Sequence, residues 1–162
     1  MKQYTLRPLQ KVRYVVAIDP DLNASGVAAW CNESKSWLFA KSVSIEIILE
    51  ALKEIPKEDS IIFLEAGWLI KKANLRGGNI RTAQAKARNV GENHATGKLI
   101  GKIVRAAGYE VQEFKPLKKG AFKTLAGSWS EIGRNYVHKQ SRLTHRMNDD
   151  VRDAIYTVLH FR

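Results

Sequence analysis

The chain has 162 residues, of which 44% are hydrophobic, and it carries 27 Lys and Arg against 16 Asp and Glu, a formal net charge of +11 at pH 7. This length suits a single domain over residues 1–162 with a buried core, and the hydrophobic share excludes a disordered basic tail. The excess of positive charge predicts a polyanionic partner, for which nucleic acid is the first candidate and an anionic membrane surface the second.

The first third of the chain predicts strands joined by turns and followed by a helix. Tyr14–Asp19 is a short apolar run rich in β-branched residues, which is typical of a buried strand. Pro20–Asn23 has the composition of a turn. The segments Ser25–Cys31 and Ser36–Val43 flank a polar turn and together predict a β-hairpin. Ser44–Ile55 has apolar residues at helical spacing, so we expect a helix there.

The rest of the chain predicts further strands and two long helices. Ser60–Glu65 is almost wholly apolar and predicts another buried strand, and Glu110–Phe114 predicts a fourth or an edge strand. Asn79–Ala107 and Asp149–His160 have helical patterns. Lys115–Arg146 is basic, and no pattern in it decides its structure. Strands alternating with helices predict an α/β fold.

The last predicted helix begins with three aspartates in a strongly basic chain. Its apolar residues recur about one helical turn apart and form a core-facing stripe: Val151, Ala154, Ile155, Val158 and Leu159. Asp150 and Asp153 lie three residues apart beside this stripe, whereas Asp149 points towards the N-cap region. Acidic residues in a first turn cap free N–H groups and complement the helix dipole, which accounts for Asp149. This explains Asp150 and Asp153 less well, because like charges at this spacing repel each other.

Two more carboxylates lie where predicted strands end. Taken alone, Asp19 is a turn residue before a proline and Glu65 is the start of a surface loop. Functional groups of open α/β sheets, however, gather beyond the carboxyl ends of strands. With Asp150 and Asp153 these acids would repel one another strongly unless cations lie among them, and Mg²⁺ prefers such oxygen ligands. Two such metals can hold the attacking and leaving oxygens of a phosphodiester displacement.

Three segments, in this order, resemble the RuvC-type Holliday junction resolvases of the RNase H-like superfamily. That family opens with a strand ending Ile-Asp-Pro-Gly and a return strand containing Thr-Gly, which Ile18-Asp19-Pro20 and Ser25-Gly26 match. Its second acid ends a later strand, as Glu65 does. Its last two acids are three residues apart at the start of the final helix, the second followed by alanine, as are Asp150 and Asp153-Ala154. The resemblance covers most of the chain.

The resemblance implies an RNase H-like α/β fold with a mixed five-stranded sheet and helices on both faces. It implies a Mg²⁺-dependent endonuclease, in which Mn²⁺ can substitute, that resolves four-way DNA junctions by phosphodiester hydrolysis in recombination and repair. Asp19 would bridge the metals, Glu65 and Asp150 would ligate them, and Asp153 would complete the catalytic cluster. A homodimer is also implied, because two sites related by a two-fold axis can cut two strands of a pseudo-symmetric junction.

A basic segment after Glu65 predicts a DNA-binding surface. Trp68 follows this acid by three residues, and the family carries an aromatic here that is used near the branch point of the junction. The cations of the segment, which are expected to contact phosphates, are Lys71, Lys72, Arg76, Arg81, Lys86 and Arg88. The alternative is that Trp68 is a core residue and that the charges form a solvated face.

Two features do not follow the family pattern closely. Asp21 stands where the family has glycine, and we expect a turn residue there rather than an extra acid near the metals. The family also places a lysine soon after an aromatic-x-Pro segment, and the spacing here does not decide between Lys118 and Lys119. We expect both lysines to belong to the DNA-binding surface.

Two other functions remain open from the sequence. One is a different RNase H-like nuclease that acts on flap DNA, RNA or an RNA–DNA hybrid, and the other is a non-catalytic DNA-binding relative, against which the four acids argue. The lone Cys31, the absence of a signal-peptide core and the lack of an apolar run of about 20 residues predict a cytoplasmic protein, bacterial or phage-encoded, with no membrane partner.

Overall fold

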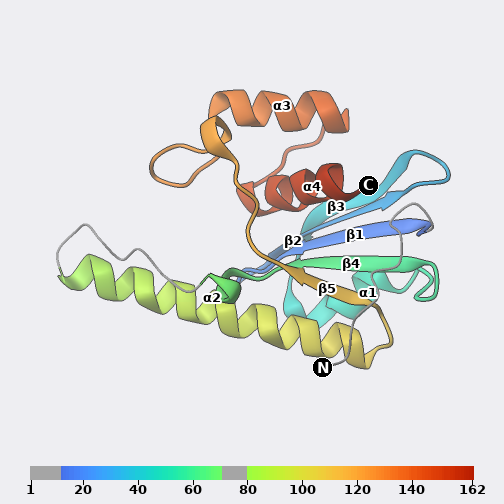
Figure 1. Cartoon of the computed structure of the whole chain (residues 1–162), viewed down its shortest axis with the longest axis horizontal. Coiled ribbons are helices and arrows are strands. Elements are labelled where there is room, and N and C mark those ends of the chain that lie inside the picture. Colours follow the sequence, from blue (N-terminus) through green and yellow to red (C-terminus); the bar gives the residue numbers. More distant parts are fainter. Residues whose placement is uncertain (1–11, 71–79) are drawn as a thin grey trace.

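A five-stranded mixed sheet forms the centre of the computed structural model, which describes residues 12–70 and 80–162 (Figure 1). Its strands lie in the order β3-β2-β1-β4-β5. They are β1 (Tyr14–Asp19), β2 (Ser25–Cys31), β3 (Ser36–Val43), β4 (Ser60–Glu65) and β5 (Val111–Phe114). The pairs β1–β2 and β2–β3 are antiparallel, whereas β1–β4 and β4–β5 are parallel. The expected mixed five-stranded sheet is confirmed.

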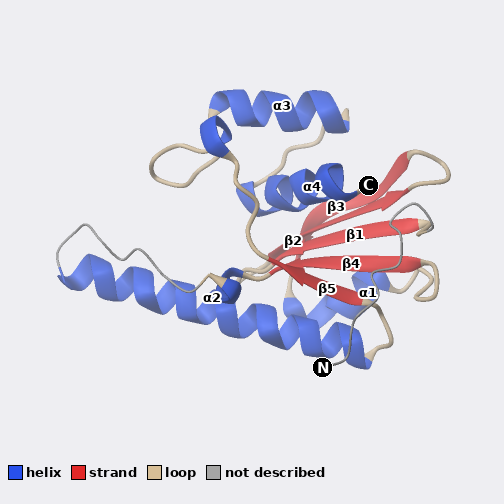
Figure 2. Cartoon of the chain, in the orientation of Figure 1, coloured by secondary structure: helices blue, strands red, loops and turns tan. Residues whose placement is uncertain are grey.

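Helices cover both faces of this sheet, as expected (Figure 2). The α-helices are α1 (Ile48–Leu52), α2 (Ile80–Ala106), α3 (Glu131–Ser141) and α4 (Asp149–Phe161), and short 3-10 turns are η2 (Ile45–Ile47), η3 (Gly67–Leu69) and η4 (Gly120–Phe122). One face packs against α4, with α3 outside it, and the other packs against α1 and α2. Among the described residues, no helix combines the length and the apolar character needed to cross a membrane.

The alternation of side chains along the two central strands decides which way their last residues point. Val15 and Ala17 of β1 belong to the core on the α4 side, and so does Phe63 of β4. Side chains in a strand point to alternate faces, so residues two apart share a face. Asp19 and Glu65 continue these two series and therefore turn towards the face that α4 covers.

Only the carboxyl-terminal half of α2 packs against the sheet. Its 27 residues give a helix about 40 Å long. Its buried residues all lie in the second half: Thr96, Gly97, Ile100, Gly101 and Val104. The first half projects past the end of the sheet (Figure 1). Most residues of this projecting half are exposed.

One expected helix was wrong, and one helix lies in a stretch that the sequence left unassigned. The expected helix over Ser44–Ile55 is a 3-10 turn followed by the five-residue α1, because the backbone of Ile47 (φ −114°, ψ 14°) interrupts the helix. The unassigned basic stretch contains α3, whose N-cap Ser130 accepts a hydrogen bond from the backbone N–H of Gly133. A Cβ at Gly133 would lie 2.4 Å from the carbonyl oxygen of Phe122, so this glycine lets α3 approach η4 closely.

Candidate active site

The two central parallel strands bring Asp19 and Glu65 together. Ile18 pairs with Leu64 in the parallel register of β1 and β4, and each acid is the next residue of its strand. Both acids therefore lie at the carboxyl edge of the sheet, where open α/β proteins place their functional groups. Both face α4, the helix that carries the other two predicted acids.

Gly26 allows the first turn of α4 to reach this edge. It pairs with Asp19 across β1 and β2. A Cβ added to Gly26 would lie 2.0 Å from the carbonyl oxygen of Asp150, a backbone atom that cannot move without moving α4. The Ser25-Gly26 pair thus has a packing role, because it lets the helix that carries Asp150 and Asp153 touch β2.

Replacing Gly26 with alanine should displace the start of α4. We expect a loss of stability of about 1–3 kcal/mol, typical of overpacking, and a larger loss of any activity that depends on Asp150. Gly91→Ala is the matched control, because a Cβ at Gly91 meets nothing within 4 Å in an exposed part of α2. Thermal melting and a nuclease assay on both variants test this. Equal behaviour of the two would show that Gly26 does not position α4.

The N-cap of α4 is Asn148, not Asp149. Its side chain accepts a hydrogen bond from the backbone N–H of Val151 (2.9 Å) and donates one to Ser42 Oγ (2.9 Å). Asp149 accepts from the backbone N–H of Trp129 (3.1 Å) and from Arg152 (2.8 Å). The expectation that Asp149 caps the helix was wrong, because the residue before it already supplies the cap.

The four predicted acids share one electrostatic environment. Loss of solvation raises the pKa of Asp19 well above its usual value, and the carboxylates of Glu65, Asp153 and Asp150 raise it further. Desolvation also raises the pKa of Glu65, although Lys119 opposes it. The pKa of Asp150 rises to about 6 through burial and then through Asp21 and Asp153. The structure therefore brings Asp19, Glu65, Asp150 and Asp153 close enough to repel one another.

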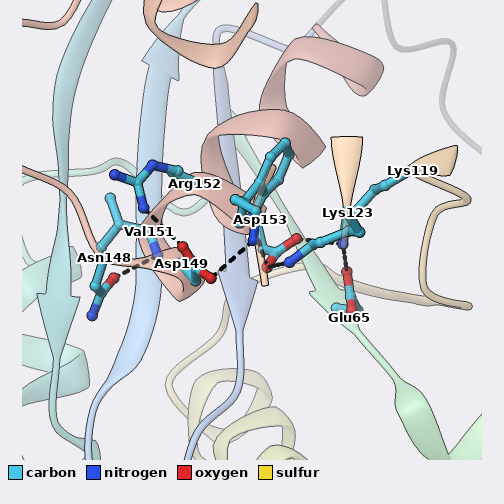
Figure 3. A network of polar contacts seen from close by, with 9 residues as sticks. Glu65, Lys119, Lys123, Asn148, Asp149, Val151, Arg152 and Asp153 are labelled. Atoms are coloured by element: carbon cyan, nitrogen blue, oxygen red, sulfur yellow. Dashed lines mark hydrogen bonds and ion pairs between the residues drawn. The ribbon is translucent and has the colours of Figure 1, made fainter. Parts of the chain in front are cut away.

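Two lysines lie among these acids (Figure 3). Lys119 Nζ is 2.5 Å from Asp153 Oδ1 and 3.5 Å from Glu65 Oε2, and Lys123 Nζ is 2.8 Å from Asp153 Oδ2. Burial lowers the pKa of Lys119, but the carboxylates of Glu65 and Asp153 outweigh this and raise it overall. Lys118 is exposed. The structure thus places Lys119, rather than Lys118, with the acids.

Trp129 holds the lysine-bearing loop on α4. Its indole N–H donates to Asp153 Oδ2 (3.1 Å), and only 1% of its surface is exposed. Phe122, in the turn between the two lysines, stacks on Trp129 and on Tyr136 of α3 (ring centroids 6.4 and 4.6 Å apart). Trp129 and Lys123 were not among the predicted site residues, because they lie in the stretch that no sequence pattern assigned.

The acids fit a hard divalent cation by their chemistry, although they do not yet form a coordination shell. Among the described residues, no three His, Cys, Asp or Glu side chains already converge as ligands. Glu65 Oε2 and Asp153 Oδ1 are buried and make no hydrogen bond, and the contact they share is the Lys119 ammonium. In the described part of the chain no cation lies within ion-pair distance of Asp19 or Asp150, although the charge of Lys119 lowers the pKa of Asp19 and that of Lys123 lowers the pKa of Asp150. Asp19, Glu65 and Asp150 are therefore the residues most available to a metal, whereas Lys123 and Trp129 already bind Asp153.

Trp68 lies at the rim of this cluster. A cleft of about 200 Å³ is lined by Trp68 and His94 together with Asp19 and Glu65. Trp68 is partly buried: a Cβ at Gly97 would lie 2.5 Å from its ring, and its indole N–H donates to Glu113 (3.2 Å). One edge of Trp68 thus packs on α2 while the residue also faces the cleft.

Trp68→Ala should lower both stability and activity. The ring packs on α2, and a fully buried tryptophan truncated to alanine loses about 3–5 kcal/mol, so a partly buried one should lose less than this. If the exposed part stacks on an unpaired base, binding of branched DNA should also weaken by about 1–3 kcal/mol. Trp68→Phe keeps an aromatic ring and should retain most of the binding. Melting curves and DNA titrations on both variants separate these contributions, and a Trp68→Ala protein that binds normally would exclude stacking.

The other predicted residues are dispersed. Arg81, Lys86 and Arg88 are exposed on the projecting half of α2, and Lys71, Lys72 and Arg76 lie outside the described residues. Asp21 Oδ1 accepts from the backbone N–H of Asn23 (2.9 Å), which is a turn contact as expected. Asp21 also contributes to the raised pKa of Asp150, so it lies near the acids as well.

Comparison with solved structures finds chains of the same fold, among them a RuvC bound to DNA. The RuvC of T. thermophilus, solved in complex with a Holliday junction substrate, matches with a TM-score of 0.52 and 16% sequence identity, over 88% of this chain and 87% of that chain. No protein-family model matches the sequence, and a search of curated proteins found no match. At this identity the likeness shows the fold alone. The chain therefore has the mixed-sheet α/β architecture of RuvC, an RNase H-like fold.

Proposed function

We propose that this protein is a divalent-metal-dependent endonuclease that resolves four-way DNA junctions. The observation that carries the proposal is the gathering of Asp19, Glu65, Asp150 and Asp153 at the carboxyl edge of an RNase H-like sheet. The net charge of +11 supports a polyanionic substrate. The neighbour of the same fold, solved with a Holliday junction, supports branched DNA as its form.

The acids and lysines have separate tasks in this proposal. A divalent ion, when bound, lowers the pKa of water and stabilises charge on a phosphate. Asp19, Glu65 and Asp150 would hold this ion, which would be Mg²⁺ or Mn²⁺. Lys123 and Trp129 keep Asp153 in one orientation. Lys119 lies between Glu65 and Asp153, so its ammonium is placed to contact the scissile phosphate once the acids have another cation.

The projecting half of α2 and the rim residue Trp68 would position the DNA. Arg81, Lys86 and Arg88 present positive charge beyond the sheet, where phosphates can reach them. Lys71, Lys72 and Arg76 precede them in the chain and would add to this charge. A homodimer would place two acid clusters on one junction and so cut two strands.

One assay tests the proposed function. The protein is incubated with a labelled four-way junction, a linear duplex and an RNA–DNA hybrid, each with Mg²⁺, with Ca²⁺ and with EDTA. We expect junction cleavage with Mg²⁺, binding without cleavage with Ca²⁺, whose looser coordination suits these ligands less well for chemistry, and no cleavage in EDTA. Preferred cleavage of the hybrid would instead support another RNase H-like nuclease, and undiminished cleavage in EDTA would exclude a metal-dependent reaction.

Binding of Mg²⁺ should depend on pH because of Asp150. Its pKa is about 6 in the folded protein against an ordinary value of 3.8, so the folded state binds more protons than the unfolded state between these values. Metal-free stability should therefore fall as pH rises through about 6. Mg²⁺ requires the ionised carboxylates, so the rise in melting temperature that it causes should be larger well above pH 6 than well below it.

Melting curves with Mg²⁺ and with EDTA on either side of pH 6 measure this difference. Asp150→Asn is the control variant, and it should respond less to pH. A thermal shift by Mg²⁺ that is the same at both pH values would show that Asp150 does not take part in binding the ion.

A further inference from the structure

The face that carries α3 has a basic groove that extends away from the acid cluster. Three clefts of about 740, 410 and 240 Å³ follow the second half of α3 and the segment 142–148, which returns to α4. Among the described residues, no aspartate or glutamate lines any of them. We define the α3 track as six cations that line these clefts: Lys35, Lys41, Lys139, Arg142, Arg146 and Arg162.

The charges of the α3 track lack counterions. Within the described part of the chain, no carboxylate lies within ion-pair distance of Lys35, Lys139, Arg142 or Arg146, and all four are exposed. Elsewhere cations do find acids, as Arg105 does with Glu113 at 2.7 Å. Like charges gathered without counterions raise the free energy of the folded state, and an anionic ligand would relieve this repulsion.

Helix dipoles account for only part of the α3 track. Lys139 and Arg162 lie at the carboxyl ends of α3 and α4, where cations are favourable. Lys35 and Lys41 lie on the β2–β3 hairpin, and Arg146 lies between helices, so no helix end explains them. The charges are thus collected from four separate segments onto one groove.

The largest of these three clefts is lined by two tryptophans that pack against each other. The guanidinium of Arg162 lies 4.2 Å from the centre of the Trp30 ring, and Trp30 packs edge-on against Trp37 (5.1 Å). The indole N–H of Trp37 donates to the carbonyl of Ser141 at the end of α3 (3.0 Å). These contacts join the hairpin to both helix ends. They also hold the Arg162 guanidinium against two aromatic rings, so this cation needs little ordering on binding.

The α3 track and the acids lie at distances that one DNA backbone can span. Arg162 follows Asp150 by 12 residues in α4, which corresponds to about 18 Å along the helix. A DNA strand advances about 3.4 Å per base, so this distance is about five nucleotides. The near end of the α3 track reaches Asn148, the N-cap of the helix that carries the acids.

We propose that the α3 track binds the phosphates of a duplex DNA arm that leads away from the cleavage site. The proposal rests on the proposed function only in taking the polyanion to be the substrate DNA. It assigns DNA contacts to a surface separate from α2 and Trp68, on the opposite face of the sheet. Duplex length beyond the cut, rather than base sequence, is what this surface would recognise, because phosphate contacts carry no sequence information.

The test uses binding in EDTA, so that no cleavage occurs. The probes are fluorescent four-way junctions with arms of about five base pairs, each arm held together by an interstrand cross-link because so short a duplex would otherwise separate, and junctions with arms of twice that length or more. The variant Lys139→Gln/Arg142→Gln removes two charges from the end of the α3 track that lies with Arg162, away from the acids, and Lys57→Gln/Lys102→Gln removes two exposed charges elsewhere. For the long-armed junction we expect the first variant to bind about ten-fold more weakly, and its slope of log affinity against log salt to fall by about 1.8. On the short-armed junction it should bind like the wild type.

Equal losses in the two double variants, or equal losses on both junctions, would overturn the proposal. Melting temperatures of both variants are measured, and Lys35→Gln/Lys41→Gln repeats the test from the hairpin side. Stronger binding to phosphatidylserine vesicles than to long-armed DNA, lost in the same variants, would overturn it in favour of a membrane surface. A protein that binds through the α3 track but does not cut with Mg²⁺ would overturn the proposed function alone, and one that cuts while the variants bind normally would overturn the α3 track alone.

Discussion

Replacing Asp19 with asparagine should abolish cleavage and leave DNA binding intact. Asparagine keeps the size of the side chain and one oxygen, but it removes the negative charge at the centre of the acid cluster. Metal ions stabilise developing charge by several kcal/mol, so losing their anchor should slow cleavage about 1000-fold or more. Affinity for DNA comes mainly from Lys and Arg contacts to phosphate and should survive, with an unchanged salt dependence.

The measurement is a gel-shift titration at several salt concentrations beside a cleavage assay with Mg²⁺. Asp59→Asn is the matched control, because it removes the same charge from an exposed residue at the opposite end of β4. The metal-free Asp19→Asn protein should also melt at a higher temperature than the wild type near neutral pH. Burial first, and then repulsion from three carboxylates, raise the pKa of Asp19, and a neutral amide removes both costs of the charge. If Asp19→Asn cleaved DNA at nearly the wild-type rate, Asp19 would be a turn residue with no part in catalysis.

Replacing Lys119 with methionine should destabilise the metal-free protein strongly. Its side chain is 8% exposed, and its ammonium lies between the carboxylates of Glu65 and Asp153. Removing one partner of a buried ion pair leaves uncompensated charge and costs about 3–5 kcal/mol. If the acids accept a divalent cation, Mg²⁺ should restore more stability to Lys119→Met than it adds to the wild type, because no ammonium competes for the same oxygens.

Denaturant unfolding with EDTA and with Mg²⁺ measures both effects, and no nuclease activity is needed. Lys118→Met is the control, because Lys118 is exposed and should tolerate the change. Acid should also rescue the variant in EDTA: the raised pKa values of Asp19 and Glu65 mean that protonation stabilises the folded state as pH falls. A Lys119→Met protein that unfolds like the wild type in EDTA would contradict the ion-pair role, and an equal response to Mg²⁺ would contradict the competition.

The sequence alone determined the two strands that present Asp19 and Glu65. Both are short apolar runs whose pattern is local, and the alternation of side chains along a strand follows from backbone geometry. The apolar stripe of α4 and the spacing of Asp150 and Asp153 are also local features, since residues three or four apart share a helix face. The expected segments match β1, β4 and α4 to within one residue.

Tertiary structure decided what surrounds the acids. Lys118 and Lys119 are adjacent in the sequence and equally basic, and only the path of the loop over α4 places Lys119 between Glu65 and Asp153. That path depends on Trp129, whose indole N–H donates a hydrogen bond to Asp153, a residue 24 positions later in the chain. Contacts between residues so distant in the chain leave no periodic signal in the sequence.

The same reason applies to the α3 track and to Gly26. Lys35 precedes Arg146 and Arg162 by more than a hundred residues, and the packing of a hairpin against two helix ends brings all three to one face. Gly26 appeared only as part of a family motif, and its role is visible only because the carbonyl of Asp150 occupies the space where a Cβ would be. The local sequence pattern therefore determined which acids are candidates, and long-range packing decided which cations and which surfaces lie beside them.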